Sequence, residues 1–407
     1  MLLRLALRNI WRNKRRTLLT VSAMVVSSSL LILALGVFSG MFRDMLASAT
    51  EQYHGHLVVS ARGYQEDRDM FSFLQPGSAL EEAIQSTKGL TGASPRLRAF
   101  GLVSHTDTSQ PAELLGVLPQ RERQVTSLAE KTVAGGYLPD SPANGAFMGH
   151  GLAEKLGVAP GDELVFLTQA ADGSIGNDLL RVTGLFETGD AGHDNSLVLV
   201  GLPWLQQVTV MQDRLHEVAL GVLEPMRAAE IALPLNTRLP EGTEALDWGQ
   251  LLPEMREAIA AYDVSRFIVV IILYLATGLG ILNTFFMSVM ERTREFGILM
   301  AMGMRPWRIR TLVLLESLLM GGISLVLGLT LGLAMSLYMA EVGLDLSGHL
   351  TPITYAGGTI LPRLSAVLEW PNFSVPAVLL FAVCLMAGFL PASRAARLNP
   401  VEAIREE

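Results

Sequence analysis

The sequence is poor in cysteine, lysine and charge, and each shortage excludes a class of site. Its one cysteine, Cys384, lies in an apolar run, which excludes disulfides and cysteine-based metal sites and indicates inert packing. Only four lysines occur, none of them after a glycine, so a Gly-x-x-x-x-Gly-Lys-Ser/Thr phosphate loop is absent. If nucleotide hydrolysis drives this protein, we expect another polypeptide to perform it.

Groups of residues typical of a catalytic site are equally scarce. The sequence contains no Gly-x-Ser-x-Gly elbow. His54 and His56 could form a metal pair at strand spacing, but no third ligand is evident, and ordinary strand residues explain them better. Asp190, His193 and Asp194 lie among turn formers, which is typical of a solvated loop. We therefore predict no catalytic residue, no metal site and no enzymatic activity for this chain.

Apolar residues, in contrast, are abundant. The chain of 407 residues is 50% hydrophobic and 17% charged, a composition typical of membrane proteins. A helix needs about 20 apolar residues to cross a bilayer, and four runs qualify: 17–42, 267–290, 317–340 and 370–393. The first is far longer than the apolar region of a cleaved signal peptide, about 7–15 residues. We predict four membrane-spanning helices, the first a retained anchor.

Charge is divided between the parts of the chain. Residues 43–263 hold 15 basic and 30 acidic residues, whereas the remainder holds 16 basic and 9 acidic ones. Fourteen of those sixteen basic residues lie before the first predicted span, between the second and the third, or after the fourth, and these segments share one side of the membrane. Because basic residues concentrate on the cytoplasmic side of a membrane, we expect both termini and the connection at 291–309 to be cytoplasmic and the acidic middle to lie outside.

Three domains are predicted: an amphipathic helix and first span at 1–42, an external α+β domain with a stalk at 43–265, and three spans with a short tail at 266–407. Within the middle domain, "GHLVVSA", "AELLGVL", "DELVFL", "LLRVTGLF" and "NSLVLVG" have strand composition, and "ALEEAIQSTKGL" and "HGLAEKLGV" favour helix. No strong breaker follows Pro253 before the second span, which predicts a continuous stalk-to-membrane helix.

Two cytoplasmic segments are amphipathic. At the N-terminus, arginines at helical spacing oppose Leu3, Ala6, Leu7, Ile10 and Trp11, which favours a helix in the membrane interface or simple charged anchoring. In the 291–309 connection, one helical stripe contains Phe296, Leu299, Met300, Gly303, Met304 and Trp307, and Pro306 limits its continuation. This stripe is expected to contact either a groove on a soluble partner or the lipid headgroups.

The string "SVMERTREFGILMAMGMRPWRI", together with "LALRNIWRNKRRTLLT", "LLESLLMGG" and "PASRAARLNPVEAIREE", resembles the MacB-like, FtsX-like permease family. This resemblance implies an ABC transporter subunit of the bacterial inner membrane with four spans, paired with an identical or related protomer. Each protomer would dock a coupling helix into a separate ATP-binding subunit, which would hold the ATP and Mg, so no cofactor is expected on this chain. The implied coupling residues are Glu291, Arg292, Arg294, Glu295, Gly297, Leu299, Ala301 and Gly303.

The external segments "GHGLAEKLGVAPGDELVFL" and "LRVTGLFETGD" resemble the lipoprotein-releasing permeases LolC and LolE. The implied cargo is a lipoprotein or another amphiphile, with a periplasmic chaperone or adaptor as a further partner. Two departures bear on this expectation. In chaperone-binding relatives a protruding hook stands in the place of the connection "TQAADGSIGND", which is short and polar here. In the macrolide-exporting branch the ATPase is fused to the permease chain, whereas this sequence contains no ATPase. A peptide or small-amphiphile exporter and an FtsX-like signalling permease without cargo are therefore alternatives.

Within the spans, five residues are candidates for a dimer seam or substrate cleft. Gly278, Gly280 and Asn283 favour close helix contact, and Phe286 could line an apolar cleft or face lipid. The third run extends back to Thr311 if Glu316 is tolerated, which makes Glu316 the one acid within a span, and such an acid is a functional candidate by default. Its alternative is an interfacial carboxylate paired with Arg308, Arg310 or a helix terminus.

Overall fold

The computed structural model describes residues 2–12, 14–140, 144–355, 358–360, 362–399 and 403. The chain divides into a helical unit (Met1–Phe42, Ala260–Gly348 and Arg363–Glu407) and an α/β unit (Arg43–Ile259 and His349–Pro362). Most of the predicted tail after Asn399 lies outside the described residues.

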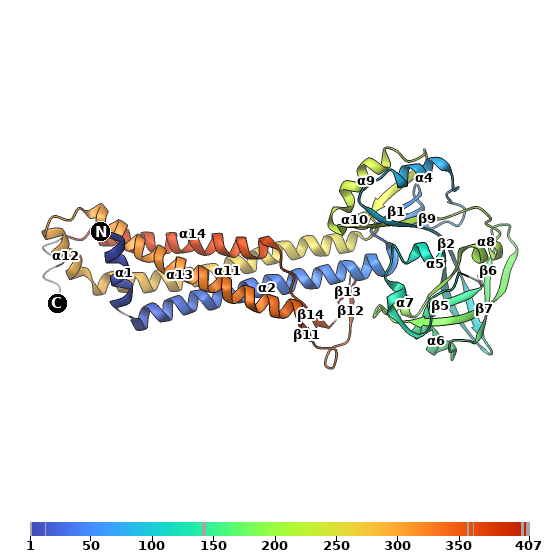
Figure 1. The fold of residues 1–407 in the computed structure, drawn as a ribbon, viewed down its shortest axis with the longest axis horizontal. Coiled ribbons are helices and arrows are strands. Elements are labelled where there is room, and N and C mark those ends of the chain that lie inside the picture. Colours follow the sequence, from blue (N-terminus) through green and yellow to red (C-terminus); the bar gives the residue numbers. More distant parts are fainter. Residues whose placement is uncertain are drawn as a thin grey trace. The chain divides into compact units, whose positions relative to one another are not determined.

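The helical unit contains the long helices α2 (Lys14–Ala49), α11 (Pro253–Glu291), α13 (Pro306–Glu341) and α14 (Trp370–Ala395) (Figure 1). It also contains the shorter helices α1 (Leu2–Arg12) and α12 (Thr293–Ala301). A short ladder joins β11 (Leu344–Asp345) to β14 (Arg363–Leu364). Within the described residues, α2, α11, α13 and α14 are long and apolar enough to cross a membrane, which confirms the four predicted apolar helices. The continuous helix expected after Pro253 is α11.

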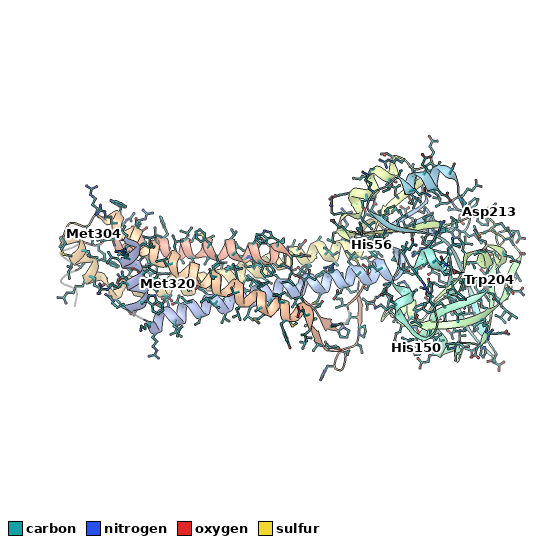
Figure 2. All side chains as sticks on the ribbon, viewed as in Figure 1. His56, His150, Trp204, Asp213, Met304 and Met320 are labelled. Atoms are coloured by element: carbon teal, nitrogen blue, oxygen red, sulfur yellow. The ribbon has the colours of Figure 1, made fainter. Side chains whose placement is uncertain are left out.

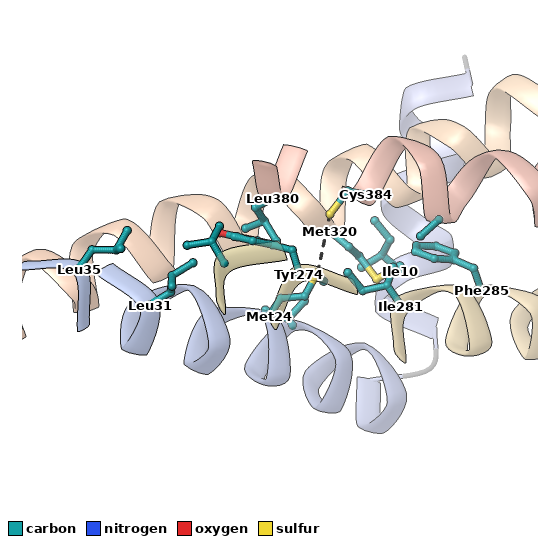
Figure 3. Packing of buried hydrophobic residues seen from close by; sticks show 13 residues of the cluster. Ile10, Met24, Leu31, Leu35, Tyr274, Ile281, Phe285, Met320, Leu380 and Cys384 are labelled. Atoms are coloured by element: carbon teal, nitrogen blue, oxygen red, sulfur yellow. Dashed lines mark hydrogen bonds between the residues drawn. The ribbon is translucent and has the colours of Figure 1, made fainter. Parts of the chain in front are cut away.

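Side chains from five helices fill the core of this unit (Figure 3). Ile10 of α1 and Met24 of α2 meet Phe285 of α11, Met320 of α13 and Cys384 of α14. The Cys384 Sγ lies 3.8 Å from the Met24 Sδ, in accord with an inert packing role. Helices α2 and α13 approach so closely that a Cβ on Gly328 would lie 2.0 Å from the Ser28 Oγ. Small residues permit such close approach of helices. Between helices surrounded by lipid, van der Waals packing and not the hydrophobic effect drives association.

The α/β unit contains twelve strands within the described residues. They are β1 (Leu57–Ala61), β2 (Leu90–His105), β3 (Thr108–Val117), β4 (Thr132–Gly135), β5 (Gly145–Gly149), β6 (Glu163–Gln169), β7 (Ile175–Phe186), β8 (Leu197–Gly201), β9 (Glu217–Val222), β10 (Thr243–Asp247), β12 (Ile353–Tyr355) and β13 (Gly358–Ile360).

Short helices connect these strands. They are the π-helix η1 (Thr50–His54), α3 (Tyr64–Asp67), α4 (Ser78–Gln85), α5 (Pro119–Glu122), η2 (Leu128–Lys131), α6 (His150–Leu156), α7 (Ala191–Asp194), α8 (Leu202–Val208), η3 (Pro225–Arg227), α9 (Ala228–Asn236) and α10 (Trp248–Leu251). Among them, α4 and α6 are the two helices predicted from sequence, and α6 ends at Gly157, whose φ of +70° suits glycine.

Six of the strands pair in a closed ring. The order is β2, β3, β8, β5, β7, β6 and back to β2, with parallel pairing in β3–β8 and β5–β7. The N-terminal half of β2 also pairs with β9, from which β1 and β10 continue the sheet, and β4 pairs with β7. Helix α8 packs on the ring, where its Leu205 contacts Gly116 of β3. Apolar side chains from consecutive strands thereby form one core around Phe147 and Phe186.

The five predicted strands are present as β1, β3, β6, β7 and β8. The connection between β6 and β7 is an ordinary antiparallel hairpin, as predicted, with Gln169 opposite Ile175. Its tip closes through a hydrogen bond from the Ala170 N–H to the Ser174 carbonyl oxygen (2.9 Å). Among the described residues this hairpin therefore carries no protruding hook.

Candidate functional site

The connection between α11 and α13 consists of one short helix and a turn, and not of a single helix over 291–309 as predicted. Helix α12 begins at Thr293 and ends at Ala301. Gly303 then adopts a φ of +92°, Arg305 is extended, and Pro306 opens α13. Because a positive φ suits glycine and proline suits the first turn of a helix, these two residues set the break.

Four of the six residues of the predicted stripe face inward, whereas Gly303 and Trp307 are exposed. Phe296 is fully buried, and Leu299, Met300 and Met304 pack with it against Ile309, Leu312 and Val313 of α13, Ala6 of α1, and Ala392 and Ala395 of α14. Figure 2 labels Met304 at the end of the helical unit that carries α12. The periodicity identified a buried face correctly, but the helix turns that face onto its own neighbours.

The opposite face of the connection is exposed and partly apolar. Ile298 is 43% exposed, Met302 72% and Trp307 55%, and Ala301 and Gly303 are exposed with them. Arg294, Arg305 and Arg308 are exposed around these residues, as is Glu291. Of the predicted coupling residues, Gly297 is buried and Leu299, Arg292 and Glu295 are half-buried. The outward surface is therefore apolar at its centre and basic at its edge.

A chain of polar contacts ties α12 to α1 and α13. The Arg292 Nη1 donates to both Glu316 carboxylate oxygens at 3.0 Å, and its Nε donates to Glu295 at 3.1 Å. Arg12 of α1 pairs with Glu295 at 2.7 Å, and the Asn9 Nδ2 donates to Glu316 at 2.6 Å. Glu316 is thus a paired carboxylate, as the alternative held, but its partner is Arg292 and not the predicted Arg308 or Arg310.

Burial divides this polar chain into a strong inner part and a weak outer part. The side chains of Arg292 and Glu316 are only 11% and 6% exposed, so breaking their pair would leave a buried charge without a partner. The side chains of Arg12 and Glu295 are 55% and 43% exposed, and an ion pair so accessible to water contributes little. Burial raises the pKa of the Glu295 carboxyl, but hydrogen bonds from Arg12 and Arg292 outweigh burial and lower this pKa overall.

Two adjacent hollows lie beside this chain of contacts. A polar cavity of about 220 Å³ is lined by Asn9, Arg12, Thr17, Ser288, Arg292 and Glu316, among others. A more apolar groove of about 660 Å³ runs between α2 and α11. Thr20 and Thr284 border both.

The five candidates in the spans do not form one site. Gly280 and Asn283 line the groove, whereas Glu316 lines the polar cavity. Gly278 faces α14, where an added Cβ would lie 3.0 Å from the Val383 Cγ1, and Phe286 is half-buried. The structure therefore brings together only Gly280 and Asn283.

A second polar cluster, which sequence reasoning missed, is buried in the α/β unit. Arg96 and Arg98 of β2 are almost fully buried and share Glu217 of β9, at 3.5 and 2.7 Å respectively. Arg96 also pairs with Glu122 (2.5 Å), and Arg98 pairs with Glu113 and contacts Tyr53. The Arg96 Nη1 further donates to the His54 carbonyl oxygen at 3.3 Å. The cluster thus joins η1 to β2, β3, β9 and α5.

His54 and His56 do not lie at the strand spacing expected from sequence. His54 ends η1 and is not in a strand, and the His56 Nδ1 accepts a hydrogen bond from the Val222 N–H at 3.0 Å. Burial lowers the pKa of His56, labelled in Figure 2, to about 4. No group of three or more His, Cys, Asp or Glu side chains that could hold a metal occurs among the described residues.

Comparison with known families decides the identity. Residues 17–232, more than half of the chain, match the MacB-like periplasmic core domain, and residues 267–400 match the FtsX-like permease C-terminal domain. The chain belongs to the MacB-like, FtsX-like permease family. It is an ABC transporter permease of the LolC, LolE and MacB type, as the resemblance implied.

Several relatives of this permease match along most of its length. A lipoprotein-releasing system transmembrane protein LolC from Xylella fastidiosa is 26% identical over 404 residues, 95% of this chain and 93% of that protein. LolE from Haemophilus influenzae is 23% identical over 332 residues, 80% of each chain. A macrolide export ATP-binding/permease protein MacB from Marinobacter nauticus is 23% identical over 439 residues, covering 100% of this chain and 60% of that protein.

Proposed function

We propose that this permease is a transmembrane subunit that receives the motion of a separate ATP-binding subunit at the α12 connection and relays it to the α/β unit. The observation that carries the proposal is the outward surface of Ile298, Met302 and Trp307, rimmed by arginines. Exposed apolar residues at the centre of a patch with charges at its edge suit a protein groove. Two such subunits, with their ATP and Mg, would serve a pair of permease protomers, identical or related.

The proposed orientation follows from charge. Basic residues concentrate at the ends of the helical unit near α1 and α12, whereas residues 43–263 are strongly acidic. With the basic ends cytoplasmic, the α/β unit lies in the periplasm of a bacterial inner membrane, and α12 is accessible to a cytoplasmic ATPase.

The cargo we propose is a lipoprotein or another amphiphile of the inner membrane. The LolC and LolE relatives belong, by their names, to a lipoprotein-releasing system. The groove between α2 and α11 supplies an apolar surface on which Gly280 leaves open space. Proteoliposomes that hold the permease and its ATPase should release lipidated cargo when ATP is added; release that does not depend on ATP would contradict this assignment.

One observation favours a second candidate, an exporter of peptides or small amphiphiles. The MacB match covers the whole of this chain, and the β6–β7 hairpin is short where a chaperone-binding hook would protrude. Co-purification of a periplasmic adaptor, together with altered secretion on deletion, would support export. A periplasmic partner without any transported cargo would instead indicate an FtsX-like signalling permease.

The docking surface is tested by a matched pair of charge insertions. Met302→Asp places a carboxylate at the centre of the surface, whereas Leu233→Asp makes the same change at an equally exposed residue of α9. ATPase co-purified with tagged Met302→Asp should fall at least about tenfold, since tenfold corresponds to only about 1.4 kcal/mol. Equal recovery of the ATPase with both variants would refute α12 as the docking element.

A further inference from the structure

Helix α1 has two faces with different surroundings. Ala6 and Ile10 are buried against the helical unit, whereas Leu3, Leu7 and Trp11 are exposed on the other side. Trp11 is 67% exposed, and Arg4 and Arg8 are exposed beside it. The outward face thus combines an apolar row with a basic row one residue apart. Helix α2 begins two residues later, at Lys14, so this face lies where a membrane-spanning helix starts.

The same helix touches the coupling connection on its inner side. Asn9 donates to Glu316 of α13, and Arg12 pairs with Glu295 of α12. Glu295 and Glu316 are in turn bridged by Arg292. A displacement of α1 therefore reaches α12 through these polar contacts, in addition to the packing of Ala6 against Phe296. The outer of these two contacts is an exposed ion pair, which a competing anion can weaken.

We propose that α1 binds an anionic lipid surface and that this attachment holds α12 in its docking position. Charge and apolarity identify the occupant: aliphatic and indole side chains enter the acyl boundary while adjacent arginines meet anionic headgroups. The effect on ATPase coupling rests on the function proposed above. The attachment of α1 to lipid and the restraint of α12 do not rest on it.

The lipid attachment is tested with the whole chain in nanodiscs, using Trp11 as the reporter. Brominated phosphatidylglycerol should quench the Trp11 fluorescence, taken as the difference between wild type and Trp11→Phe, more than brominated phosphatidylcholine. Arg4→Gln/Arg8→Gln should weaken the attachment roughly thirtyfold, since each basic residue near an anionic surface contributes about fivefold. Arg227→Gln/Arg238→Gln, the same charge change in the α/β unit, should leave the quenching unchanged. Equal quenching by both lipids would overturn the proposal.

The restraint of α12 is tested by hydrogen exchange of residues 293–301 in the same nanodiscs. Exchange should be slower in anionic than in neutral lipid for wild type, and this difference should shrink in Asn9→Ala/Arg12→Gln although Trp11 quenching persists. A lipid-dependent difference of undiminished size in that variant would overturn the polar link between α1 and α12. Neither readout needs the ATPase. A failure of the ATPase to associate would therefore refute the proposed function only, and the quenching and exchange measurements would decide this inference independently.

Discussion

Replacing Arg98 by methionine should destabilise the α/β unit far more than replacing Glu217 by glutamine. The buried cluster holds two guanidinium groups, on Arg96 and Arg98, and three carboxylates, on Glu113, Glu122 and Glu217. Negative charge is therefore already in excess. Loss of Arg98 increases this excess and leaves Glu217 with Arg96, at 3.5 Å, as its cationic partner and Gln65, at 2.8 Å, as a neutral donor. Removing one partner of a buried pair costs about 3–5 kcal/mol.

The Glu217→Gln variant has the opposite effect on the charge balance. Arg96 keeps Glu122 and Arg98 keeps Glu113, so each guanidinium retains one carboxylate. What is lost is the charge-assisted bond to Arg98 at 2.7 Å, which contributes about 1.5 kcal/mol. The matched control is Arg227→Met, because Arg227 also pairs with two glutamates, Glu224 and Glu230, but on the surface. The control should match the wild type within error.

The measurement is the free energy of opening of β2 and β9, from hydrogen exchange of the full-length protein in mild detergent. The expected order of loss is Arg98→Met first, Glu217→Gln second and Arg227→Met last, with about 2 kcal/mol between the first two. A loss for Glu217→Gln as large as that for Arg98→Met would refute the charge argument, since it would mean that shape and not charge balance governs the cluster.

Two further predictions follow from the same contacts and from helix packing. Burial raises the pKa of Glu217, but Arg98 and Arg96 outweigh it and hold the pKa far below the ordinary 4.5, so its stabilisation is complete above pH 4.5 and is lost as pH falls further. The difference in the urea midpoint of the α/β unit between wild type and Glu217→Gln should thus be constant from pH 7 to 5.5, because histidine titration is common to both proteins, and should shrink below about pH 4.5; a difference that stays constant below pH 4.5 would contradict this assignment. Gly328→Leu should lower the melting temperature in detergent by several degrees, because Ser28 lies 2.0 Å from its Cβ position, whereas Gly322→Leu meets open space; equal losses would show that close approach of α2 and α13 is not the cause.

The elements with simple patterns were predictable from sequence. The four predicted apolar runs correspond to α2, α11, α13 and α14, because an apolar run of about 20 residues is the length that a helix needs to cross a bilayer. Strands such as β8, all buried, carry an uninterrupted apolar run, "LVLVG". β2 was missed because Pro95, Arg96 and Arg98 obscure its pattern, and the arginines are tolerated only through carboxylates from distant segments. Such pairing is a tertiary property that no local pattern carries.

A helix within the 291–309 connection was predicted, but the inward orientation of most of its apolar stripe was not. Periodicity shows which residues of α12 share a face, but not whether that face meets α13 and α14 or a partner. The partner of Glu316 was not predicted either. Arg308 and Arg310 are nearer to Glu316 in sequence, yet Arg292, directly after the end of α11, donates to its carboxylate. Asn9 could have been noticed, since it is the polar uncharged residue between arginines in α1, but its partner lies 307 residues away.

The pairing of β1 with β10 has a consequence for biosynthesis. Leu57 lies opposite Asp247, so about 190 residues must emerge before the first strand of the domain acquires that neighbour. At typical elongation rates of about 5–20 residues per second, this interval lasts roughly 10–40 s. During that time "LVVSA" is a nascent strand with at least one unpaired edge and an apolar surface, a species prone to mispairing. The folding of this domain should accordingly depend on chaperones that shield emerging strands until the chain turns back.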